Sequence, residues 1–149
     1  MSRQNVSTAL RYPTTMYAPP ALPDLSREEE RRRLSPAALR AFFNIVSRWG
    51  IRDEDARQLL GGISNGKYYQ LKQDPRHVLD QDRLQRVSYL IGIFKALNIL
   101  YGTRLADSWI QLANTNSLFT GRTPLNYMLQ GGTPAMEVVR RLLDARRGG

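Results

Sequence analysis

The feature that most constrains this 149-residue sequence is a long apolar pattern over residues 82–101. Apolar side chains recur there every three or four residues, which places them on one face of an α-helix. They are Leu84, Val87, Leu90, Ile91, Phe94, Leu97 and Leu100. Because this face is wide, the helix must be packed on more than one side. We expect it to begin at Asp80 or Asp82, to end at Gly102 and to lie at the centre of the fold.

Shorter helical patterns precede and follow this segment. Ser35-Pro36 predicts an N-cap with proline at the first helical position, for a helix that Gly50 ends. Asp53 is a second N-cap candidate. Further helices are predicted over 53–60, 64–73, 105–112, after Pro124, and over 134–145. The sequence shows no strand pattern and no internal repeat. We therefore predict an all-α fold, with an N-terminal helix-turn-helix bundle followed by a small helical domain.

Composition divides the chain into three segments. Residues 1–34 are predicted to be a flexible N-terminal arm, because prolines interrupt them and the charge run Arg27–Arg33 follows as a short polar helix. This arm has the charge to touch DNA, although its composition favours a disordered tail. Residues 35–81 are predicted to form the helix-turn-helix domain, and residues 82–149 a C-terminal domain.

The charge balance favours an anionic partner. The chain has 22 Lys+Arg against 13 Asp+Glu, a net charge of +9, and lysine occurs only at Lys67, Lys72 and Lys95. Arginine forks suit phosphate and carboxylate groups, so nucleic acid is the first candidate partner. The N-terminus lacks the apolar core of a signal peptide, and no apolar stretch is long enough to span a membrane. The sequence therefore predicts a cytoplasmic protein with no membrane partner.

The residue inventory argues against an enzyme. No cysteine is present, which excludes disulfides, thiol nucleophiles and cysteine-based metal sites. The single histidine, His77, has no evident Ser/Asp partners, and the sequence contains no phosphate-binding loop, dinucleotide fingerprint or metal motif. We expect no catalytic residue, no metal and no cofactor.

Residues 53–73 have the proportions of a helix-turn-helix, with two short helices joined by Gly61-Gly62-Ile63. Ile63 is expected to fill the angle between the two helices. The second helix would present groups able to reach base edges and phosphates, namely Ser64, Asn65, Lys67, Tyr68, Gln70 and Gln73. Such proteins usually bind as homodimers. Asn65-Gly66 is also a hairpin signal, and a helical hairpin that merely packs is the alternative.

Three stretches resemble the Xre/MbcA/ParS-type antitoxins, over about residues 36–149. LLGGISNGKYYQLKQ resembles the Xre-like helix-turn-helix of that family, and RVSYLIGIFKALNILYG is similar to its long core helix. The stretch WIQLANTNSLFTGRTPLNYMLQGGTPAMEVVRRLLDARRGG resembles its C-terminal toxin-binding domain. The most specific part runs from Asn114 to Leu125.

The resemblance implies an antitoxin of a type II toxin-antitoxin system. Its partners would be operator DNA, through which it represses its own operon, and a RES-domain toxin that depletes NAD. In related pairs the antitoxin's C-terminal end sits over the toxin's active site. The resemblance thus implies a toxin-binding set comprising Asn114, Phe119, Arg122, Arg140, Arg146, Arg147, Gly148 and Gly149. Arg146 and Arg147 would form a flexible cationic tail that enters a pocket built for an anionic dinucleotide.

Each of these residues also has a purely structural interpretation. Asn114 can cap backbone groups, Phe119 can belong to the core, and arginines at a helix C-terminus favour the negative end of the helix dipole. The alternative function is a stand-alone helix-turn-helix transcription regulator with a C-terminal dimerisation domain.

Overall fold

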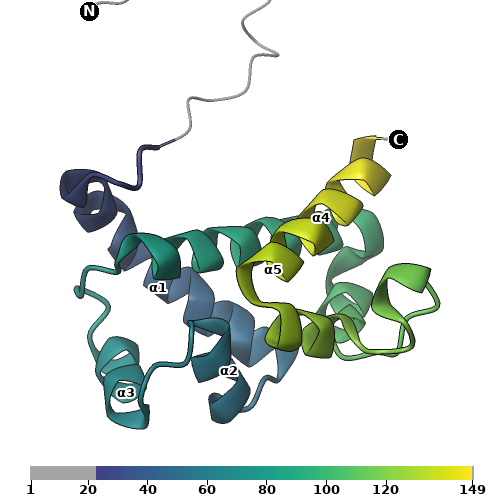
Figure 1. The fold of residues 1–149 in the computed structure, drawn as a ribbon, viewed down its shortest axis with the longest axis horizontal. Helices are drawn as coiled ribbons and strands as arrows, with labels where there is room; N and C mark the ends of the chain where they lie inside the picture. The colour runs from purple at the N-terminus through teal and green to yellow at the C-terminus, as the bar shows by residue number, and fades with distance from the viewer. Residues whose placement is uncertain (1–22, 149) are drawn as a thin grey trace, which may run out of the picture.

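The computed structural model describes residues 23–148, and within this range every regular element is helical (Figure 1). The all-α prediction is therefore confirmed. The elements are α1 (Glu28–Trp49), α2 (Asp53–Leu59), α3 (Asn65–Gln73), α4 (Gln81–Trp109), the 3-10 turn η4 (Ser117–Phe119) and α5 (Pro124–Gly148). None of the described helices combines the length and the apolar character that crossing a membrane requires.

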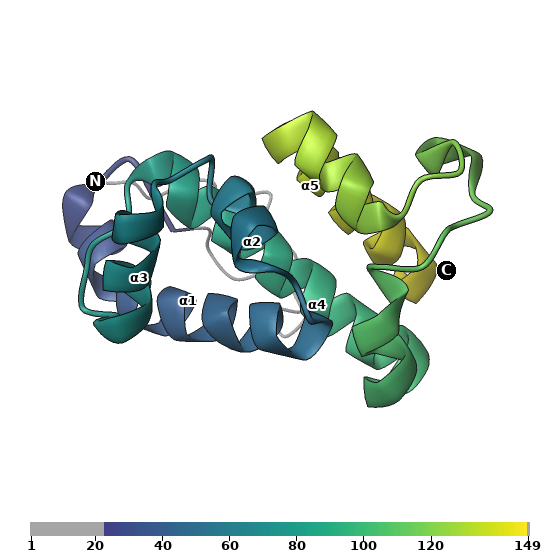
Figure 2. The ribbon, with the colours of Figure 1, turned by 90° about the horizontal axis from the view of Figure 1, so that it is seen from below.

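Helix α4 is the centre of the molecule, as the sequence predicted. It packs against α1 over one part of its surface and against α5 over another (Figures 1 and 2). Asp80 caps its N-terminus, because a carboxylate oxygen accepts the Arg83 backbone N–H at 2.9 Å. Gly102 interrupts the helix with φ 74° and ψ 167°, so that α4 consists of two helical parts, again as predicted.

Helix α1 begins at Glu28, eight residues before the predicted first helical position, Pro36. Ser35 is not its N-cap, because the helix starts at Glu28 and Pro36 lies in its interior. The polar run assigned to the arm is the first part of α1. Three glutamates stabilise this first turn through the helix dipole, and the pairs Arg32–Glu28 and Arg33–Glu30 connect successive turns. These local charges favour helix formation ahead of the proline.

Ser35 instead forms a buried polar link. Its hydroxyl donates to the Arg31 carbonyl at 2.6 Å and accepts the Leu79 backbone N–H at 2.9 Å. The residue is fully buried. This contact fastens α1 to the segment that leads into α4, and it satisfies a buried backbone donor that would otherwise have no partner.

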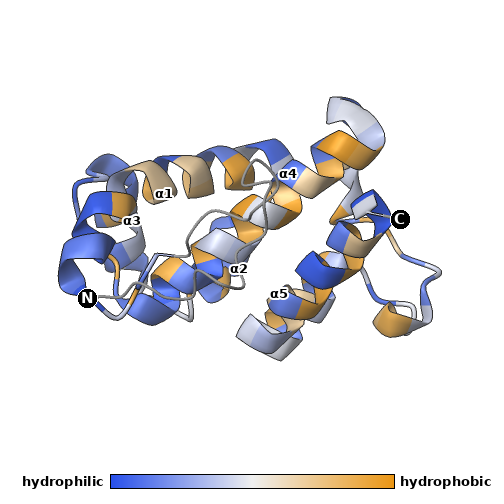
Figure 3. Ribbon diagram, turned by 90° about the horizontal axis from the view of Figure 1, so that it is seen from above, coloured by the Kyte–Doolittle hydropathy of each residue, from blue (hydrophilic) through white to orange (hydrophobic). Residues whose placement is uncertain are grey.

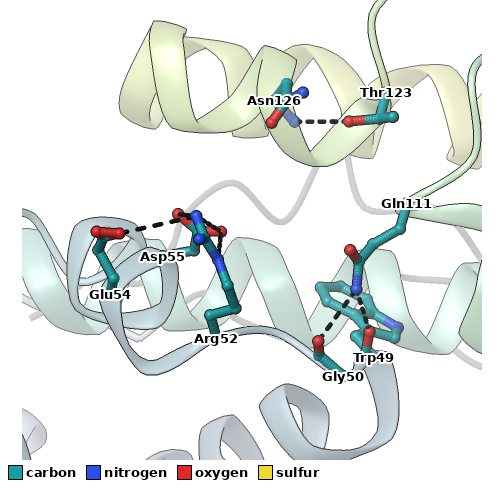
Figure 4. Close-up of polar contacts among 8 residues, drawn as sticks. All are labelled: Trp49, Gly50, Arg52, Glu54, Asp55, Gln111, Thr123 and Asn126. Carbon is teal, nitrogen blue, oxygen red and sulfur yellow. Dashed lines mark hydrogen bonds and ion pairs between the residues drawn. The ribbon is translucent and has the colours of Figure 1, made fainter.

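The C-terminal half is joined to the N-terminal half by both core and polar contacts. One apolar cluster runs from Ala38 in α1 to Leu143 in α5, and apolar segments recur along α4 and α5 (Figure 3). The Gln111 amide donates to the Trp49 carbonyl at 2.6 Å and to the Gly50 carbonyl at 3.2 Å (Figure 4). Gln58 of α2 donates to the Leu129 carbonyl at 3.0 Å. The predicted domain boundary, between residues 35–81 and residues 82–149, stays a prediction.

Replacing Ser35 with alanine tests the buried link. The substitution leaves the Leu79 N–H buried without a partner, which costs about 1–3 kcal/mol. We expect the free energy of unfolding in urea to fall by this amount. Ser47→Ala, an exposed serine of the same helix, is the control and should change stability by less than about 0.5 kcal/mol. Equal stability of the two variants would contradict this role.

Candidate functional site

Helices α2 and α3 form the helix-turn-helix that the sequence predicted. Gly61 and Gly62 adopt φ 93° and 86°, and their N–H groups bond to the last carbonyls of α2, at Gln58 and Arg57. Ile63 is buried between the helices, as expected. Ser64 caps α3 by accepting the Lys67 backbone N–H at 3.2 Å. Asn65 and Gly66 lie in the first turn of α3, so the β-hairpin that this dipeptide often indicates does not form here.

The start of α2 differs from the prediction. Asp53 is the first helical residue and not the N-cap, a position taken by Arg52 without a side-chain capping bond. Three acids in the first turn stabilise this helix end through the dipole. Arg52 pairs with the last of them, Asp55, at 3.2 Å (Figure 4).

The outer face of α3 carries most of the residues predicted to lie there. Those exposed are Ser64, Asn65, Lys67, Gln70 and Gln73. Lys67 and the exposed Lys72 have no carboxylate within 4.0 Å in the described part of the chain, whereas Arg76 is paired with Asp74 at 2.8 Å. The helix therefore presents amide, hydroxyl and unpaired ammonium groups to solvent.

Tyr68 was expected to point outward, and this expectation is wrong. The side chain is fully buried and meets Phe43 edge to face at 5.4 Å between ring centroids. A short helix needs an apolar anchor toward the core, and Tyr68 and Leu71 supply it at a spacing of three residues. Burial raises the pKa of Tyr68 to about 12, and the charge of Asp53 adds to the shift.

Tyr69 takes the outward position that was assigned to Tyr68. It is 43% exposed, and its hydroxyl donates to an Asp53 carboxylate oxygen at 3.1 Å. That hydrogen bond raises the pKa of Tyr69. The sequence analysis missed Tyr69. The signal was present, because Tyr68 and Leu71 are three residues apart and therefore share the inward face of the helix.

The loop before α5 is held by its own side chains. Asn114 accepts the Asn116 backbone N–H at 2.8 Å, the turn-forming role that was the structural alternative for it. Phe119 is fully buried and packs edge to face on Trp109 and Tyr127. Arg122 donates to the Phe119 carbonyl at 3.0 Å and to Gln130 at 2.6 Å. The three residues predicted to bind a toxin therefore also shape this loop.

Helix α5 extends further than predicted. Arg146, Arg147 and Gly148 are helical, so the expected flexible tail is wrong for these residues, and Gly149 lies outside the described residues. Asp144 pairs with Arg147 at 3.7 Å, and Arg146 donates to the Tyr101 hydroxyl at 2.9 Å. Both contacts, together with the helix dipole, favour arginines in the last turn.

Arg140 lies at the crossing of α4 and α5. Its guanidinium covers Gly92, where a Cβ atom would come within 2.3 Å of it. It also pairs with Asp144 at 3.3 Å. Glycine at position 92 thus lets this arginine pack closely on α4.

Comparison with known proteins identifies the helix-turn-helix unit. Residues 28–92 match the family described as Antitoxin Xre-like helix-turn-helix domain. A relative, the Uncharacterized protein y4oB of Sinorhizobium fredii (strain NBRC 101917 / NGR234), is 38% identical over 115 residues, which cover 76% of this chain and 87% of the relative. The chain belongs to the same family as y4oB. Among solved structures, none matches the chain.

The Xre-like domain comprises α1, α2, α3 and the first part of α4. The family match supports the interpretation of this chain as an Xre-type antitoxin or DNA-binding regulator. Within residues 23–148, no group of three or more His, Cys, Asp or Glu side chains is placed to hold a metal ion.

The buried hydroxyl of Tyr68 makes stability depend on alkaline pH. It has no hydrogen-bond partner among the described residues, and its pKa in the folded chain, about 12, exceeds the ordinary value of 10.0. Above pH 10 the unfolded chain loses the proton first, so stability falls as pH rises toward 12. We expect Tyr68→Phe to unfold with a smaller alkaline loss in stability than the wild type. An unchanged pH profile would contradict the assignment.

Proposed function

We propose that this protein is the antitoxin of a type II toxin-antitoxin system, acting in the cytoplasm. It binds and occludes the active site of a RES-domain toxin that depletes NAD, and it represses its own operon by binding operator DNA. The observation that supports this proposal is the exposed outer face of α3 within an Xre-like domain. Neither role requires a reaction carried out by this chain.

For DNA binding, the structure supports a revised set of side chains on α3. Asn65, Gln70 and Gln73 carry amides that can pair with adenine edges, while Lys67 carries a cation for a phosphate. Ser64 caps the helix and holds its N-terminus in place. Tyr69 replaces Tyr68 in this proposal because only Tyr69 is exposed.

The proposed DNA-binding form is a homodimer. Few cations lie on α3, and each phosphate contact contributes only part of the electrostatic affinity. Two copies would double these contacts and read two half-sites one helical turn apart.

For toxin binding, the proposed contact is the end of α5. Arg146 and Arg147 would cover the mouth of the toxin's active site, with Gly148 and Gly149 allowing close approach. The role proposed for Asn114, Phe119 and Arg122 is to shape the loop that faces the toxin, and Arg140 fixes α5 on α4. The arginines are then presented by an ordered helix, which lowers the entropy lost on binding.

A stand-alone transcription regulator is the second candidate. The observation that favours it is the extent of the family match, which ends at residue 92 and leaves most of the C-terminal half unmatched. A RES-type gene beside the gene for this chain would favour the antitoxin.

Lys67→Ala tests DNA binding on a fragment from upstream of the chain's own gene. Losing one phosphate contact should weaken binding and lower the slope of log affinity against log salt by about 1 per subunit. Lys95→Ala is the matched control, since Lys95 is an exposed lysine on α4 without an ion pair in the described region. Equal binding by the two variants would contradict a role for α3.

Deleting Arg146–Gly149 tests toxin neutralisation. We expect the truncated chain to protect growth and NAD level less well on co-expression with the neighbouring RES-type protein, while its melting temperature changes little. Arg141→Ala is the control, because it removes an exposed arginine of α5 that lies outside the proposed toxin contact. Full neutralisation by the truncated chain would exclude occlusion by the end of α5.

A further inference from the structure

The break in α4 at Gly102 creates a hollow on the surface. Its volume is about 490 Å³, and it is lined by Tyr101, Gly102, Thr103, Arg104, Leu105 and Ser108. The end of α5 lies beside this part of α4, since Arg146 reaches the Tyr101 hydroxyl at 2.9 Å (Figure 1). We call Tyr101, Gly102, Arg104, Leu105 and Arg146 the kink surface.

The kink surface exposes an apolar side chain that a helical core would ordinarily bury. After the break, Ala106 and Trp109 face the core, whereas Leu105 is 50% exposed. Three of the five large apolar side chains that are exposed in the described chain lie between residues 99 and 112, and Leu105 is the one that lines the hollow. Exposed apolar surface beside polar groups is typical of an interaction site.

The cations of the kink surface are unopposed. Arg104 and Arg146 have no carboxylate within 4.0 Å among residues 23–148, whereas their neighbours on α5, Arg140, Arg141 and Arg147, each have one. The nearby acid of α4, Asp107, is paired with Arg48 at 2.8 Å. The hollow therefore combines an apolar side chain with a net positive rim.

We infer that the kink surface is a docking site for the toxin, an inference that rests on the proposed function. A toxin side chain of apolar character fills the hollow against Leu105, and toxin carboxylates pair with Arg104 and Arg146. Arginine at such a site adds specificity through its two parallel hydrogen bonds. The toxin is then anchored on α4 as well as on the end of α5.

Charge distinguishes the toxin from other occupants. A second copy docked about a two-fold axis would bring this surface against itself, and the same unpaired arginines would repel each other. DNA would neutralise the arginines but would leave Leu105 without an apolar partner. A protein with an apolar residue flanked by carboxylates satisfies both features.

Leu105→Asp is the direct test, and the chain offers a matched control in Leu112→Asp. Leu112 is also a leucine of the C-terminal half and is 51% exposed, but it does not line the hollow. Each variant is co-expressed with the RES-type protein, and complex formation, growth and NAD level are measured. We expect Leu105→Asp to weaken the complex at least tenfold and Leu112→Asp to leave it near wild type. Both variants should keep the wild-type melting temperature and operator binding.

A second variant, Arg104→Glu, covers the case in which Leu105→Asp fails to fold. It changes only an exposed charge and should weaken the complex in the same direction. Two outcomes would overturn the docking role of the kink surface but leave the antitoxin function standing. In the first, the wild type binds the toxin and neither Leu105→Asp nor Arg104→Glu weakens the complex. In the second, Leu112→Asp weakens the complex as much as Leu105→Asp does. A wild-type chain that forms no complex would overturn both the docking role and the antitoxin function. Conversion of a wild-type dimer to a monomer by Leu105→Asp, with toxin binding retained, would assign the surface to a second copy.

Discussion

The burial of α4 between α1 and α5 is the interaction on which the rest of the structure depends. Leu90, Ile93 and Leu97 are fully buried along this helix. Each such side chain contributes about 1.5–3 kcal/mol relative to exposure. Because α1 supports the helix-turn-helix and α5 carries the C-terminal arginines, both candidate surfaces are held by the same helix.

A few polar contacts fix how the other elements sit on this core. Ser35 joins α1 to the approach to α4, Gln58 joins α2 to α5, and Gln111 joins the end of α1 to the segment after α4. Each of them satisfies a backbone group of the element or loop that it reaches. Hydrogen bonds of this kind contribute little net energy when made but cost more when a partner is lost, so they set geometry more than stability.

Much of the fold followed from local patterns. The positions of Gly50 and Gly102 marked helix ends and breaks, and both have a positive φ in the structure. Exposure on α3 was also largely predictable from periodicity. One error occurred where periodicity is ambiguous. Neighbouring Tyr68 and Tyr69 differ by only one step on the helix, and packing against Phe43 decides which of them is buried.

The sequence by itself determined the helical class, the helix-turn-helix and the basic charge, because spacing and residue type control these properties locally. Tertiary structure decided that Ser35 is a buried link, that Tyr69 faces outward and that Arg146 lies beside the break in α4. The last of these depends on two side chains 45 positions apart in the sequence. Such contacts arise only when helices pack, since no local pattern encodes the distance between residues on different helices.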